Sequence, residues 1–329
     1  MKRVAINGLG RIGRVALRKL LVQSNMKIVA VNDLAAIDAA AHLIQFDTIY
    51  GPLKEDVKIE DDNIIIGAYC IKYSQEKLLE DLNWQALDID IVIDCTGLYK
   101  DYKKAYGHIS AGAKKVILSY PVVDDSIKSI VLGVNEDIIS TNDLILSNAS
   151  CTTNCGAPLL KVIDQKWGVK RGFLTTIHAY TGDQKITDAF HKDLRRSRAA
   201  ASNIIPTSTG AAKAIAKVYP DLKGKIKGMA YRVPVITGSC VDLLLELENP
   251  FNPEAINAEV KRSASQELKG ILSYTQHPIV SSDIIANSAS GIFDAQLTAD
   301  SQGLLKVVIW YDNEYGYSSR LIELCKIFS

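Results

Sequence analysis

The stretch "RVAINGLGRIGRVALRKL", residues 3–20, decides the fold of the first half of the chain. Its first five residues form a short, apolar and partly β-branched run that predicts a strand, and the helical periodicity after position 10 predicts a helix. Gly8, Gly10 and Gly13 lie at the junction as G-x-G-x-x-G. Here Gly8 permits a tight turn, Gly10 lets the backbone approach a pyrophosphate, and Gly13 lets the helix pack on the strand. The stretch predicts a dinucleotide site; a glycine-rich turn that binds nothing is the alternative.

An acidic residue follows at the distance that this motif requires. Asp33 stands twenty residues after Gly13, at the end of the second apolar run, "KIVAVND" (residues 27–33). A carboxylate in this position accepts hydrogen bonds from both adenosine ribose hydroxyls and repels a 2′-phosphate. Asp33 therefore favours NAD over NADP, and the alternative is that it only caps the following helix.

The style of the sequence changes near residue 150. Before that point strands alternate with helices, which predicts a parallel sheet, and residues 56–74 add the pattern of an inserted β-hairpin. After it come longer β-rich runs without intervening helices, which fit a mostly antiparallel mixed sheet of the α+β class. We expect a cofactor domain at 1–149, completed by a C-terminal helix at 314–329, and a second domain at 150–313.

The composition excludes several classes of function. The 329 residues carry 38 Lys and Arg against 37 Asp and Glu, mixed along the chain, so no broad field attracts nucleic acid or an anionic membrane. No apolar stretch reaches the ~18 residues of a membrane span, and the N-terminus lacks the apolar segment of a signal peptide. We expect a cytoplasmic protein whose six cysteines are thiols.

Two of these cysteines lie close together in "SNASCTTNC", residues 147–155. A metal site, a redox pair, a disulfide and one reactive thiol are the options. C-x₃-C without a second pair is a poor zinc signal, and a redox pair prefers C-x-x-C, so we predict no metal site. If a helix begins at Thr152 or Thr153, its N-terminus lowers the pKa of Cys151. Cys151 is then the candidate nucleophile and Cys155 a buried helix residue, although a packed Cys151 thiol stays an equal alternative.

A cysteine nucleophile needs a base, and His178 is the best placed of the five histidines. It lies in "TTIHAYTGDQ", where a β-rich run breaks into a polar loop of the same domain. His42 and His108 fall in predicted helices, and His191 in a basic loop. An NAD site combined with an activated thiol suggests aldehyde oxidation through a thioester.

Basic residues of the same domain predict anion binding. Arg195, Arg196 and Arg198 precede Thr207–Gly210, a predicted helix start, and hydroxyls, N–H groups and guanidinium groups together make a phosphate site. A solvated face or a subunit contact is the alternative for this loop. Arg232, in "AYRVPV", is a single charge among apolar residues, and a buried arginine usually has an anionic partner.

Several long motifs resemble the phosphorylating glyceraldehyde-3-phosphate dehydrogenase family. They include "NGLGRIGR", "SNASCTTNC", "HKDLRR", "NIIP", "STGAAKA", "RVPV" and "WYDNEYGYS", and the resemblance runs from residue 2 to the C-terminus. It implies a Rossmann domain, a catalytic domain with an eight-stranded mixed sheet, and a homotetramer. It also implies conversion of D-glyceraldehyde 3-phosphate, with NAD and inorganic phosphate, to 1,3-bisphosphoglycerate in glycolysis and gluconeogenesis.

The resemblance assigns roles to individual residues. Cys151 is the nucleophile and His178 the base. Residues expected to bind the substrate phosphate are Thr181 and Arg232, and those expected to bind the incoming phosphate are Ser150, Thr152, Arg196, Thr209 and Gly210. Residues expected to contact NAD, besides Gly8, Gly10 and Gly13, are Arg11, Ile12, Asp33, Thr96, Ser119, Asn313 and Tyr317.

Some positions depart from the commonest pattern of this family. Ala189-Phe190 replaces the Leu-Pro of many NAD-specific members, so NADP is a secondary cofactor candidate, although Asp33 argues against it. Residues 94–99 and 119–121 resemble the erythrose-4-phosphate dehydrogenase branch, which is the alternative function; Thr181 and Thr209-Gly210 favour the triose phosphate. A nucleotide-binding or interaction protein without catalysis is a remoter alternative.

Overall fold

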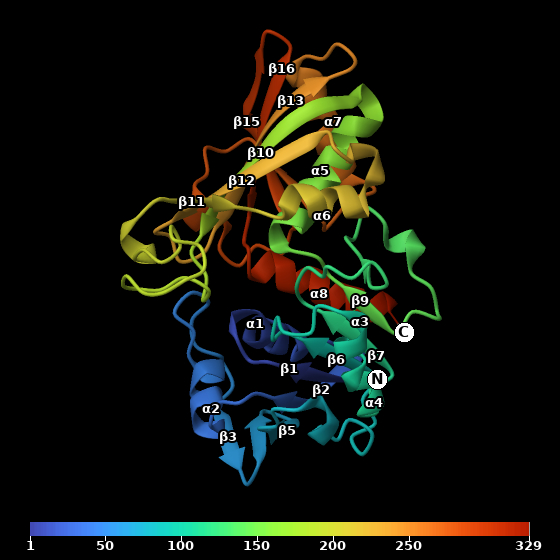
Figure 1. The fold of residues 1–329 in the computed structure, drawn as a ribbon, viewed down its shortest axis with the longest axis vertical. Coiled ribbons are helices and arrows are strands. Elements are labelled where there is room, and N and C mark those ends of the chain that lie inside the picture. The colour runs from blue at the N-terminus through green and yellow to red at the C-terminus, as the bar shows by residue number, and fades with distance from the viewer. Residues whose placement is uncertain (329) are drawn as a thin grey trace. The chain divides into compact units, whose positions relative to one another are not determined.

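The computed structural model describes residues 1–328. The chain divides into two compact units (Figure 1). The first consists of residues 1–130, 137–149 and the C-terminal segment from 318. The second consists of residues 131–136 and 150–317.

A nine-stranded sheet forms the first unit, with the order β3-β4-β5-β2-β1-β6-β7-β9-β8. Its strands are β1 (Lys2–Asn7), β2 (Met26–Asn32), β3 (Val57–Glu60), β4 (Asn63–Ile66), β5 (Tyr69–Ser74), β6 (Ile91–Asp94), β7 (Lys115–Leu118), β8 (Lys128–Ser129) and β9 (Ile145–Ser147). The six strands from β2 to β8 in this order, and the β2–β5 pair, are parallel, whereas β3, β4 and β5 pair antiparallel. The predicted parallel sheet with an inserted hairpin is confirmed.

The helices of the first unit lie mainly in the connections between strands. They are α1 (Arg11–Leu20), α2 (Ile37–Gln45), η1 (Leu79–Asp81), α3 (Tyr102–Ala105) and α4 (Gly107–Ser110). The 3-10 turn η2 (Glu136–Ile138) and helix α8 (Tyr315–Ile327) cross between the two units in sequence. The β2-β1-β6 arrangement brings the carboxyl ends of three parallel strands to one edge, which is where α/β sheets bind nucleotides.

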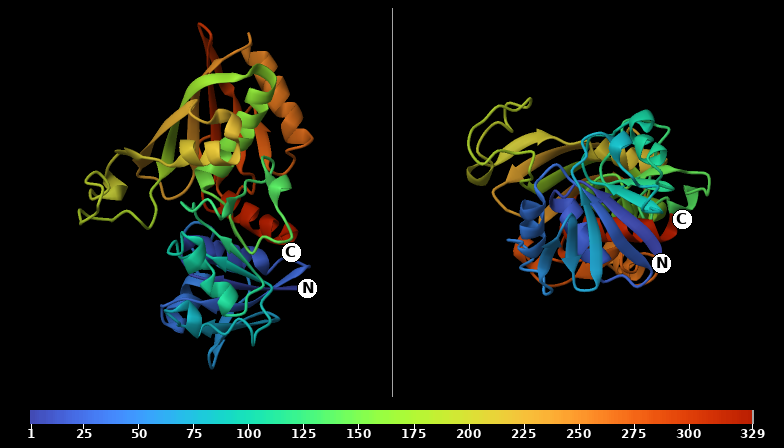
Figure 2. Two further views of the ribbon diagram at one scale, coloured as in Figure 1. Left: turned by 45° about the vertical axis from the view of Figure 1, so that its right-hand side comes forward. Right: turned by 90° about the horizontal axis from the view of Figure 1, so that it is seen from below.

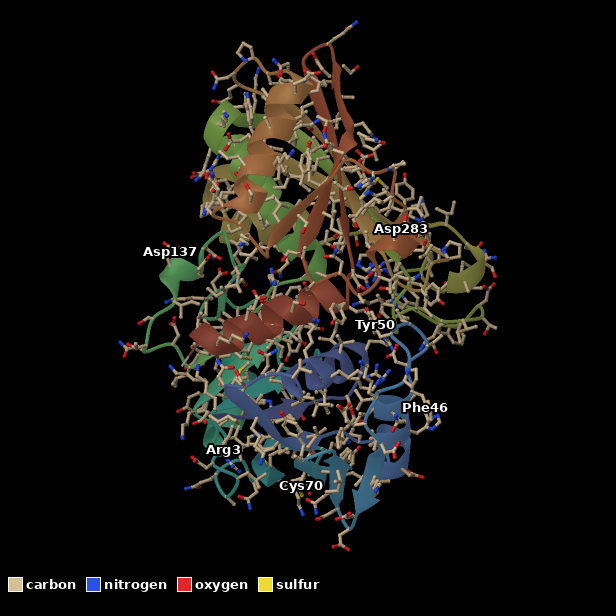
Figure 3. All side chains as sticks on the ribbon, turned by 180° about the vertical axis from the view of Figure 1, so that it is seen from behind. Arg3, Phe46, Tyr50, Cys70, Asp137 and Asp283 are labelled. Atoms are coloured by element: carbon tan, nitrogen blue, oxygen red, sulfur yellow. The ribbon has the colours of Figure 1, made fainter. Side chains whose placement is uncertain are left out.

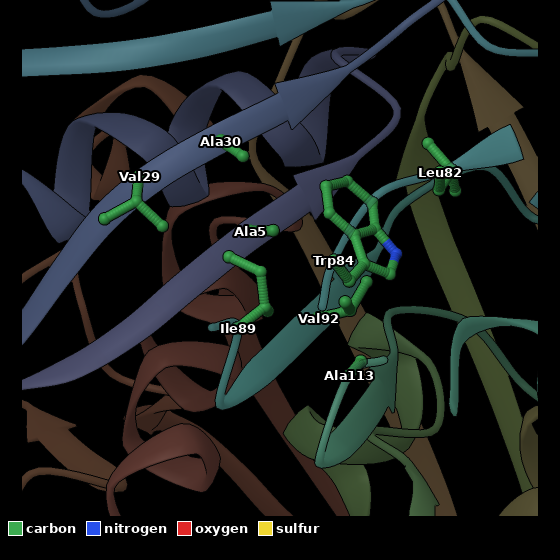
Figure 4. Close-up of a cluster of buried hydrophobic side chains, with 8 residues drawn as sticks. All are labelled: Ala5, Val29, Ala30, Leu82, Trp84, Ile89, Val92 and Ala113. Atoms are coloured by element: carbon green, nitrogen blue, oxygen red, sulfur yellow. The ribbon is translucent and has the colours of Figure 1, made fainter. Parts of the chain in front are cut away.

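The core of this unit follows from the apolar central strands. Val4, Ala5 and Ile6 of β1 are fully buried, as expected for a parallel strand covered on both faces. One cluster centres on the buried Trp84, whose ring lies among small and branched side chains (Figure 4). Its members are Ala5, Val29, Ala30, Leu82, Trp84, Ile89, Val92 and Ala113. This packing fixes the strands behind the nucleotide-binding edge.

A seven-stranded mixed sheet forms the second unit, with the order β11-β12-β10-β13-β16-β15-β14. Its strands are β10 (Val169–Ala179), β11 (Ile205–Ser208), β12 (Ile226–Val233), β13 (Ser239–Leu247), β14 (Leu272–Thr275), β15 (Gly291–Ser301) and β16 (Leu304–Tyr311). Only the β10–β12 and β14–β15 pairs are parallel, so the predicted mostly antiparallel sheet is confirmed. The family resemblance implies eight strands, and this prediction is wrong, since residues 1–328 form seven strands in this sheet. The 11-residue β15 shifts register between Asp294 and Ala299 and continues as one irregular strand.

Helices cover one face of this second sheet (Figures 1 and 2). They are α5 (Cys151–Trp167), α6 (Ala211–Val218) and α7 (Pro253–Ser265). The short turns η3 (Ala200–Ser202), η4 (Pro220–Leu222) and η5 (Ser281–Ile284) lie in the connections of this unit. Alternate side chains of β13 show the two faces, since Leu243 is fully buried and Leu244 is 42% exposed. Residues 181–204, drawn yellow-green, extend as a long loop from this unit (Figure 1).

None of the helices formed by residues 1–328 combines the length and apolar character needed to cross a membrane. All six cysteines are free thiols, and Cys70 on β5 is the exposed one (Figure 3).

Candidate active site

Cys151 is the first residue of helix α5. The helix therefore begins one or two residues earlier than predicted, because Ser150 acts as its N-cap. The Ser150 Oγ accepts a hydrogen bond of 3.1 Å from the Thr153 N–H, and this takes up one of the donors that a helix start leaves unpaired. Cys151 thus lies in the first turn, where backbone N–H groups lack acceptors within the helix. Cys155, one turn further on, is fully buried, as predicted.

The second unit brings the predicted nucleophile and base together. The Cys151 Sγ lies 3.5 Å from the His178 Nε2, within hydrogen-bond range for sulfur. His178 is the second-last residue of β10 and is 4% exposed, whereas Cys151 is partly exposed. A thiol that is open on one side and faces an imidazole on the other is the arrangement that nucleophilic catalysis requires.

Strand pairing places Arg232 beside the histidine. β12 runs parallel to β10 with His178 opposite Arg232. The Arg232 Nη1 lies 2.7 Å from the His178 Nδ1 and donates to the Ala179 carbonyl oxygen at 3.0 Å. Burial first, and this cation second, lower the pKa of His178 from 6.5 to about 3. The imidazole is therefore neutral at physiological pH and able to accept a proton.

The electrostatic environment of the thiol differs from the prediction. Burial raises the pKa of Cys151, and Arg232 together with hydrogen bonds from Thr152 and the backbone offsets only part of that rise. The backbone N–H groups of the helix start lower this pKa as predicted, but burial outweighs them, so the expectation of a lowered pKa is wrong for the protein alone. The helix dipole contributes about 0.3–1 kcal/mol, less than the cost of burying a charge among apolar groups.

Tyr311, at the end of β16, is a site residue that sequence reasoning missed. Its buried hydroxyl lies 2.9 Å from the Thr152 Oγ1 and 2.9 Å from the Thr176 Oγ1, and its ring meets the His178 ring edge-on. It thereby connects the helix that carries Cys151 to the strand that carries His178. The signal was a tyrosine ending an apolar strand, which by itself does not reveal such contacts.

Arg196, Thr209 and Arg232 were predicted to bind anions. Arg196 donates to the Asp183 Oδ2 at 2.9 Å and to the Thr207 Oγ1 at 3.0 Å, so Asp183 is a further residue that the sequence analysis missed. Thr209 lies within the same segment, and its Oγ1 accepts from the Ala211 N–H. Arg232 is half-buried, and its Nε has no hydrogen-bond partner within residues 1–328.

The remaining members of this predicted set lie at turns. Gly210 is the N-cap of α6 and has open space where a side chain would stand, and Thr181 begins the long loop after β10. Ser150 and Thr152 flank Cys151 at the start of α5. A helix start with free N–H groups suits an incoming phosphate.

The glycine loop of the first unit fits a dinucleotide. A Cβ on Gly13 would lie 2.0 Å from the Gly8 carbonyl oxygen, so α1 approaches the loop as closely as the motif predicts. A Cβ on Gly10 would meet nothing within 4 Å, so the space in front of it is open to a ligand. Gly10 is also the N-cap of α1 and leaves the N–H groups of the helix start without a side-chain acceptor. Such a helix start binds phosphate.

Asp33 holds the glycine loop directly. Its Oδ2 accepts a hydrogen bond of 2.6 Å from the Leu9 N–H, and its Oδ1 accepts from the Ala35 N–H at 2.9 Å. Helix α2 begins at Ile37 with Ala36 as the N-cap, so Asp33 is not its cap. Its carboxylate stands at the end of β2, next to the loop, where the ribose of a dinucleotide is expected.

The other predicted cofactor residues are divided between the units. Ile12 and Arg11 lie in the first turn of α1, and Arg11 forms an ion pair with the buried Asp47. Thr96 and Ser119 follow the carboxyl ends of β6 and β7. Asn313 and Tyr317 belong to the second unit, where both are buried and the Asn313 Oδ1 accepts from the Ser239 Oγ at 2.9 Å.

A dinucleotide-type sheet in one unit and a cysteine–histidine pair in the other are typical of an NAD-dependent dehydrogenase with a thiol nucleophile. Comparison with known proteins makes this class specific. Residues 2–102 match the NAD-binding domain, and residues 150–313 the C-terminal domain, of glyceraldehyde 3-phosphate dehydrogenase. The chain belongs to the glyceraldehyde 3-phosphate dehydrogenase family.

Curated relatives agree with this assignment. The chain is 53% identical over 329 residues to "Glyceraldehyde-3-phosphate dehydrogenase" of Mycobacterium avium. It is 52% identical over 330 residues to the protein of that name from Mycolicibacterium smegmatis, and 51% identical over 325 residues to "Glyceraldehyde-3-phosphate dehydrogenase 2" of Streptomyces avermitilis. Each similarity covers 98% of this chain and 97% of the relative.

Proposed function

We propose that this protein oxidises and phosphorylates D-glyceraldehyde 3-phosphate to 1,3-bisphosphoglycerate with NAD, in glycolysis and gluconeogenesis. The observation that carries the proposal is the 3.5 Å contact between the Cys151 Sγ and the His178 Nε2, at the start of α5 and beside Arg232. A chain of this family that had lost catalysis would have no reason to keep this arrangement.

The first chemical step forms a covalent bond to the enzyme. The Cys151 thiol passes its proton to His178, the sulfur attacks the aldehyde carbon, and the proton returns to the carbonyl oxygen to give a hemithioacetal. The oxygen of this intermediate lies within reach of the N–H groups in the first turn of α5, which stabilise developing negative charge. His178, neutral because of its low pKa, accepts the hydroxyl proton of the hemithioacetal. Bound NAD supplies the acceptor for the hydride that leaves the same carbon.

The second step releases the product. The oxidised carbon is then a thioester on Cys151, and an oxygen of inorganic phosphate attacks it. The carbon–sulfur bond breaks, the thiolate leaves, and the acyl phosphate departs. We assign Ser150, Thr152, Arg196, Thr209 and Gly210 to the attacking phosphate, and Thr181 and Arg232 to the phosphate that the substrate already carries. Arg232 is suited to an anion because its Nε lacks a partner within residues 1–328.

The cofactor is assigned to the edge of the first sheet. Gly8 and Gly10 would lie against the pyrophosphate, Gly13 would let α1 approach the loop, and Asp33 would lie against the adenosine ribose. Arg11, Ile12, Thr96 and Ser119 would line the same edge, and Asn313 and Tyr317 would act at the nicotinamide end. The carboxylate of Asp33 disfavours a 2′-phosphate, so NADP is at most a secondary cofactor.

We further propose a homotetramer in the cytoplasm. Leu244 and Phe173 are each more than two-fifths exposed on the helix-free face of the second sheet, and Ile186, Phe190 and Leu194 are exposed on the long loop. Exposed apolar surface of this extent fits contacts with further copies of the chain. Six unpaired cysteines fit a reducing compartment.

Steady-state kinetics tests the activity. NADH formation should require inorganic phosphate and should be faster with glyceraldehyde 3-phosphate than with erythrose 4-phosphate. A preference for the tetrose that is independent of phosphate would instead identify an erythrose-4-phosphate dehydrogenase. Absence of turnover with either aldehyde, together with retained NAD binding, would identify a non-catalytic protein. Cys151→Ser is the blank for any NADH formation that does not depend on this thiol.

A further inference from the structure

Asp94 is a fully buried carboxylate at the carboxyl end of β6, and the reaction described above does not use it. Its Oδ1 accepts from the Thr96 N–H at 3.0 Å, the Thr96 Oγ1 at 2.7 Å and the Tyr120 hydroxyl at 2.9 Å. Its Oδ2 accepts from the Asn7 Nδ2 at 2.8 Å and faces the His108 Nε2 at 3.0 Å. These donors hold the pKa of Asp94 below its usual value even though burial acts to raise it.

The tautomer of His108 follows from its neighbours. The Trp84 Nε1 lies 3.1 Å from the His108 Nδ1, and an indole nitrogen can only donate. Nδ1 is therefore the acceptor, and Nε2 carries the proton that it donates to Asp94. Trp84 is itself fixed in the apolar cluster of Figure 4. Trp84 thus fixes the orientation of His108, which donates to the Asp94 carboxylate.

The donors on the other side follow two neighbouring strands, since Thr96 comes after β6 and Tyr120 after β7. The Tyr120 hydroxyl donates to Asp94 and accepts from the Tyr99 N–H at 3.2 Å. Together with the two hydrogen bonds of Thr96, this holds both ends of the segment 96–99. The same segment packs on the glycine loop, because a Cβ on Gly8 would lie 3.1 Å from the Thr96 nitrogen and its Cγ2.

We infer that Asp94 and Tyr120 are positioning residues for the cofactor: they fix the 96–99 segment (the cofactor loop) against the glycine loop. The inference rests on NAD binding at this edge, as proposed above, but not on the identity of the aldehyde. Neither side chain needs to touch NAD. Their effect passes through Thr96 and the backbone of the cofactor loop, whose position sets the surface next to Gly8 and Gly10.

An amide cannot replace this carboxylate. In Asp94→Asn one side-chain oxygen becomes an NH₂ group, which then faces donors. If the amide faces His108, the imidazole has to accept at Nε2 and carry its proton at Nδ1, where it meets the Trp84 N–H. If it faces the other way, it opposes the hydroxyl and N–H groups of Thr96 and Tyr120. In either orientation one side of the network is broken.

The test compares NAD affinity and thermal stability in Tyr120→Phe and Asp94→Asn. Tyr69→Phe is the matched control, since it also removes a tyrosine hydroxyl that forms a hydrogen bond, to the Leu21 carbonyl oxygen at 2.8 Å. Tyr69 lies at the amino end of β5, away from the cofactor edge. NAD binding is measured by calorimetry without aldehyde or phosphate, so the outcome is independent of the substrate assignment. Steady-state kinetics adds the separation of KM for NAD from kcat.

We expect Tyr120→Phe to weaken NAD binding about fivefold to tenfold, since it loses a hydrogen bond to a charged group. Asp94→Asn should weaken it further, and KM for NAD should rise by a larger factor than kcat falls. Tyr69→Phe should lower the melting temperature without changing NAD affinity. NAD affinity within twofold of wild type in Tyr120→Phe would overturn the inference and leave these residues a purely structural role. If Asp94→Asn does not fold, Tyr120→Phe alone decides.

Discussion

The Arg232 Nη1 lies 2.7 Å from the Nδ1 of His178, the histidine that faces the Cys151 sulfur on its other side. A guanidinium only donates hydrogen bonds, so this contact makes Nδ1 an acceptor and directs the Nε2 proton toward sulfur. The Ala179 carbonyl oxygen, 2.6 Å from the same Nδ1, instead suits the tautomer that leaves Nε2 unprotonated. Moving Arg232 onto an anion would favour the second tautomer, in which Nε2 acts as the base.

Arg232 should also control the reactivity of the thiol. Its positive charge lowers the pKa of Cys151 against the larger effect of burial. Arg232→Leu should therefore raise the thiol pKa. When the rate of alkylation by iodoacetamide is measured against pH, its midpoint should move to higher pH. Arg171→Leu removes the same charge from an exposed position on β10 and should leave the midpoint in place. An unshifted midpoint in Arg232→Leu would show that the cation does not act on the sulfur.

The low pKa of His178 predicts a dependence of stability on pH. The folded protein binds a proton at His178 only near pH 3, whereas the unfolded chain binds one near its ordinary pKa of 6.5. Wild type should therefore lose stability as pH falls from about 6.5 toward 3, because the unfolded state takes up the proton first. His178→Gln lacks this contribution and should lose less stability between pH 7 and pH 4.5 in urea unfolding. His277→Gln, at an exposed position, should lose as much as wild type.

The two cysteines of α5 should differ strongly in their reactivity toward iodoacetamide. Cys151 is partly exposed beside His178, whereas Cys155 is fully buried and burial raises its pKa well above the ordinary value. Iodoacetamide should modify Cys151 first, with loss of activity in proportion, as seen by peptide mass spectrometry. Cys151→Ser should abolish NADH formation while NAD still binds, and Cys155→Ala should remain active. Early modification of Cys155 with Cys151 unmodified would reverse the assigned roles.

Features encoded by local sequence could be predicted, whereas contacts between distant residues could not. The glycine loop, Asp33 and the hairpin each depend on residues within one short stretch, and the structure places them accordingly. Tyr311 meets Thr152 across 159 positions of sequence, and no local pattern records that contact. The contact between the buried Asp94 and His108 could not be predicted for the same reason, since the sequence indicates only that His108 lies in a helix.

The predicted direction of the pKa shift of Cys151 was wrong for a different reason. The position of Cys151 at a helix start is visible in the sequence, and its contribution has the predicted direction. The burial that outweighs it depends on how β10, β12 and β16 pack around the sulfur. The number of strands in the second sheet likewise depends on pairing between distant segments. Both are properties of packing, which a single sequence does not display.

Asp33 should determine the choice of cofactor. Asp33→Asn keeps the shape of the side chain and one oxygen that can accept from the Leu9 N–H, although it loses the acceptor of the Ala35 N–H, and it removes the charge that opposes a 2′-phosphate. The ratio of kcat/KM for NAD to that for NADP should fall by about tenfold or more. Asp38→Asn makes the same charge change at an exposed position on α2 and should leave the ratio unchanged. An equal ratio in wild type and Asp33→Asn would assign cofactor choice to other residues.

Gly10 and Gly13 should fail in different ways when each is replaced by alanine. In Gly13→Ala the new Cβ would lie 2.0 Å from the Gly8 carbonyl oxygen, so helix α1 must move away from the loop. This should cost about 1–3 kcal/mol of unfolding free energy and weaken NAD binding as well.

In Gly10→Ala the Cβ meets no atom within 4 Å, and the φ of −60° at this position suits any residue. Unfolding should therefore be unchanged, while NAD binding weakens because the methyl group occupies the space that the pyrophosphate needs. Denaturant unfolding and calorimetric NAD titration of both variants separate the two effects. Wild-type NAD affinity in Gly10→Ala would mean that the pyrophosphate does not approach this part of the loop.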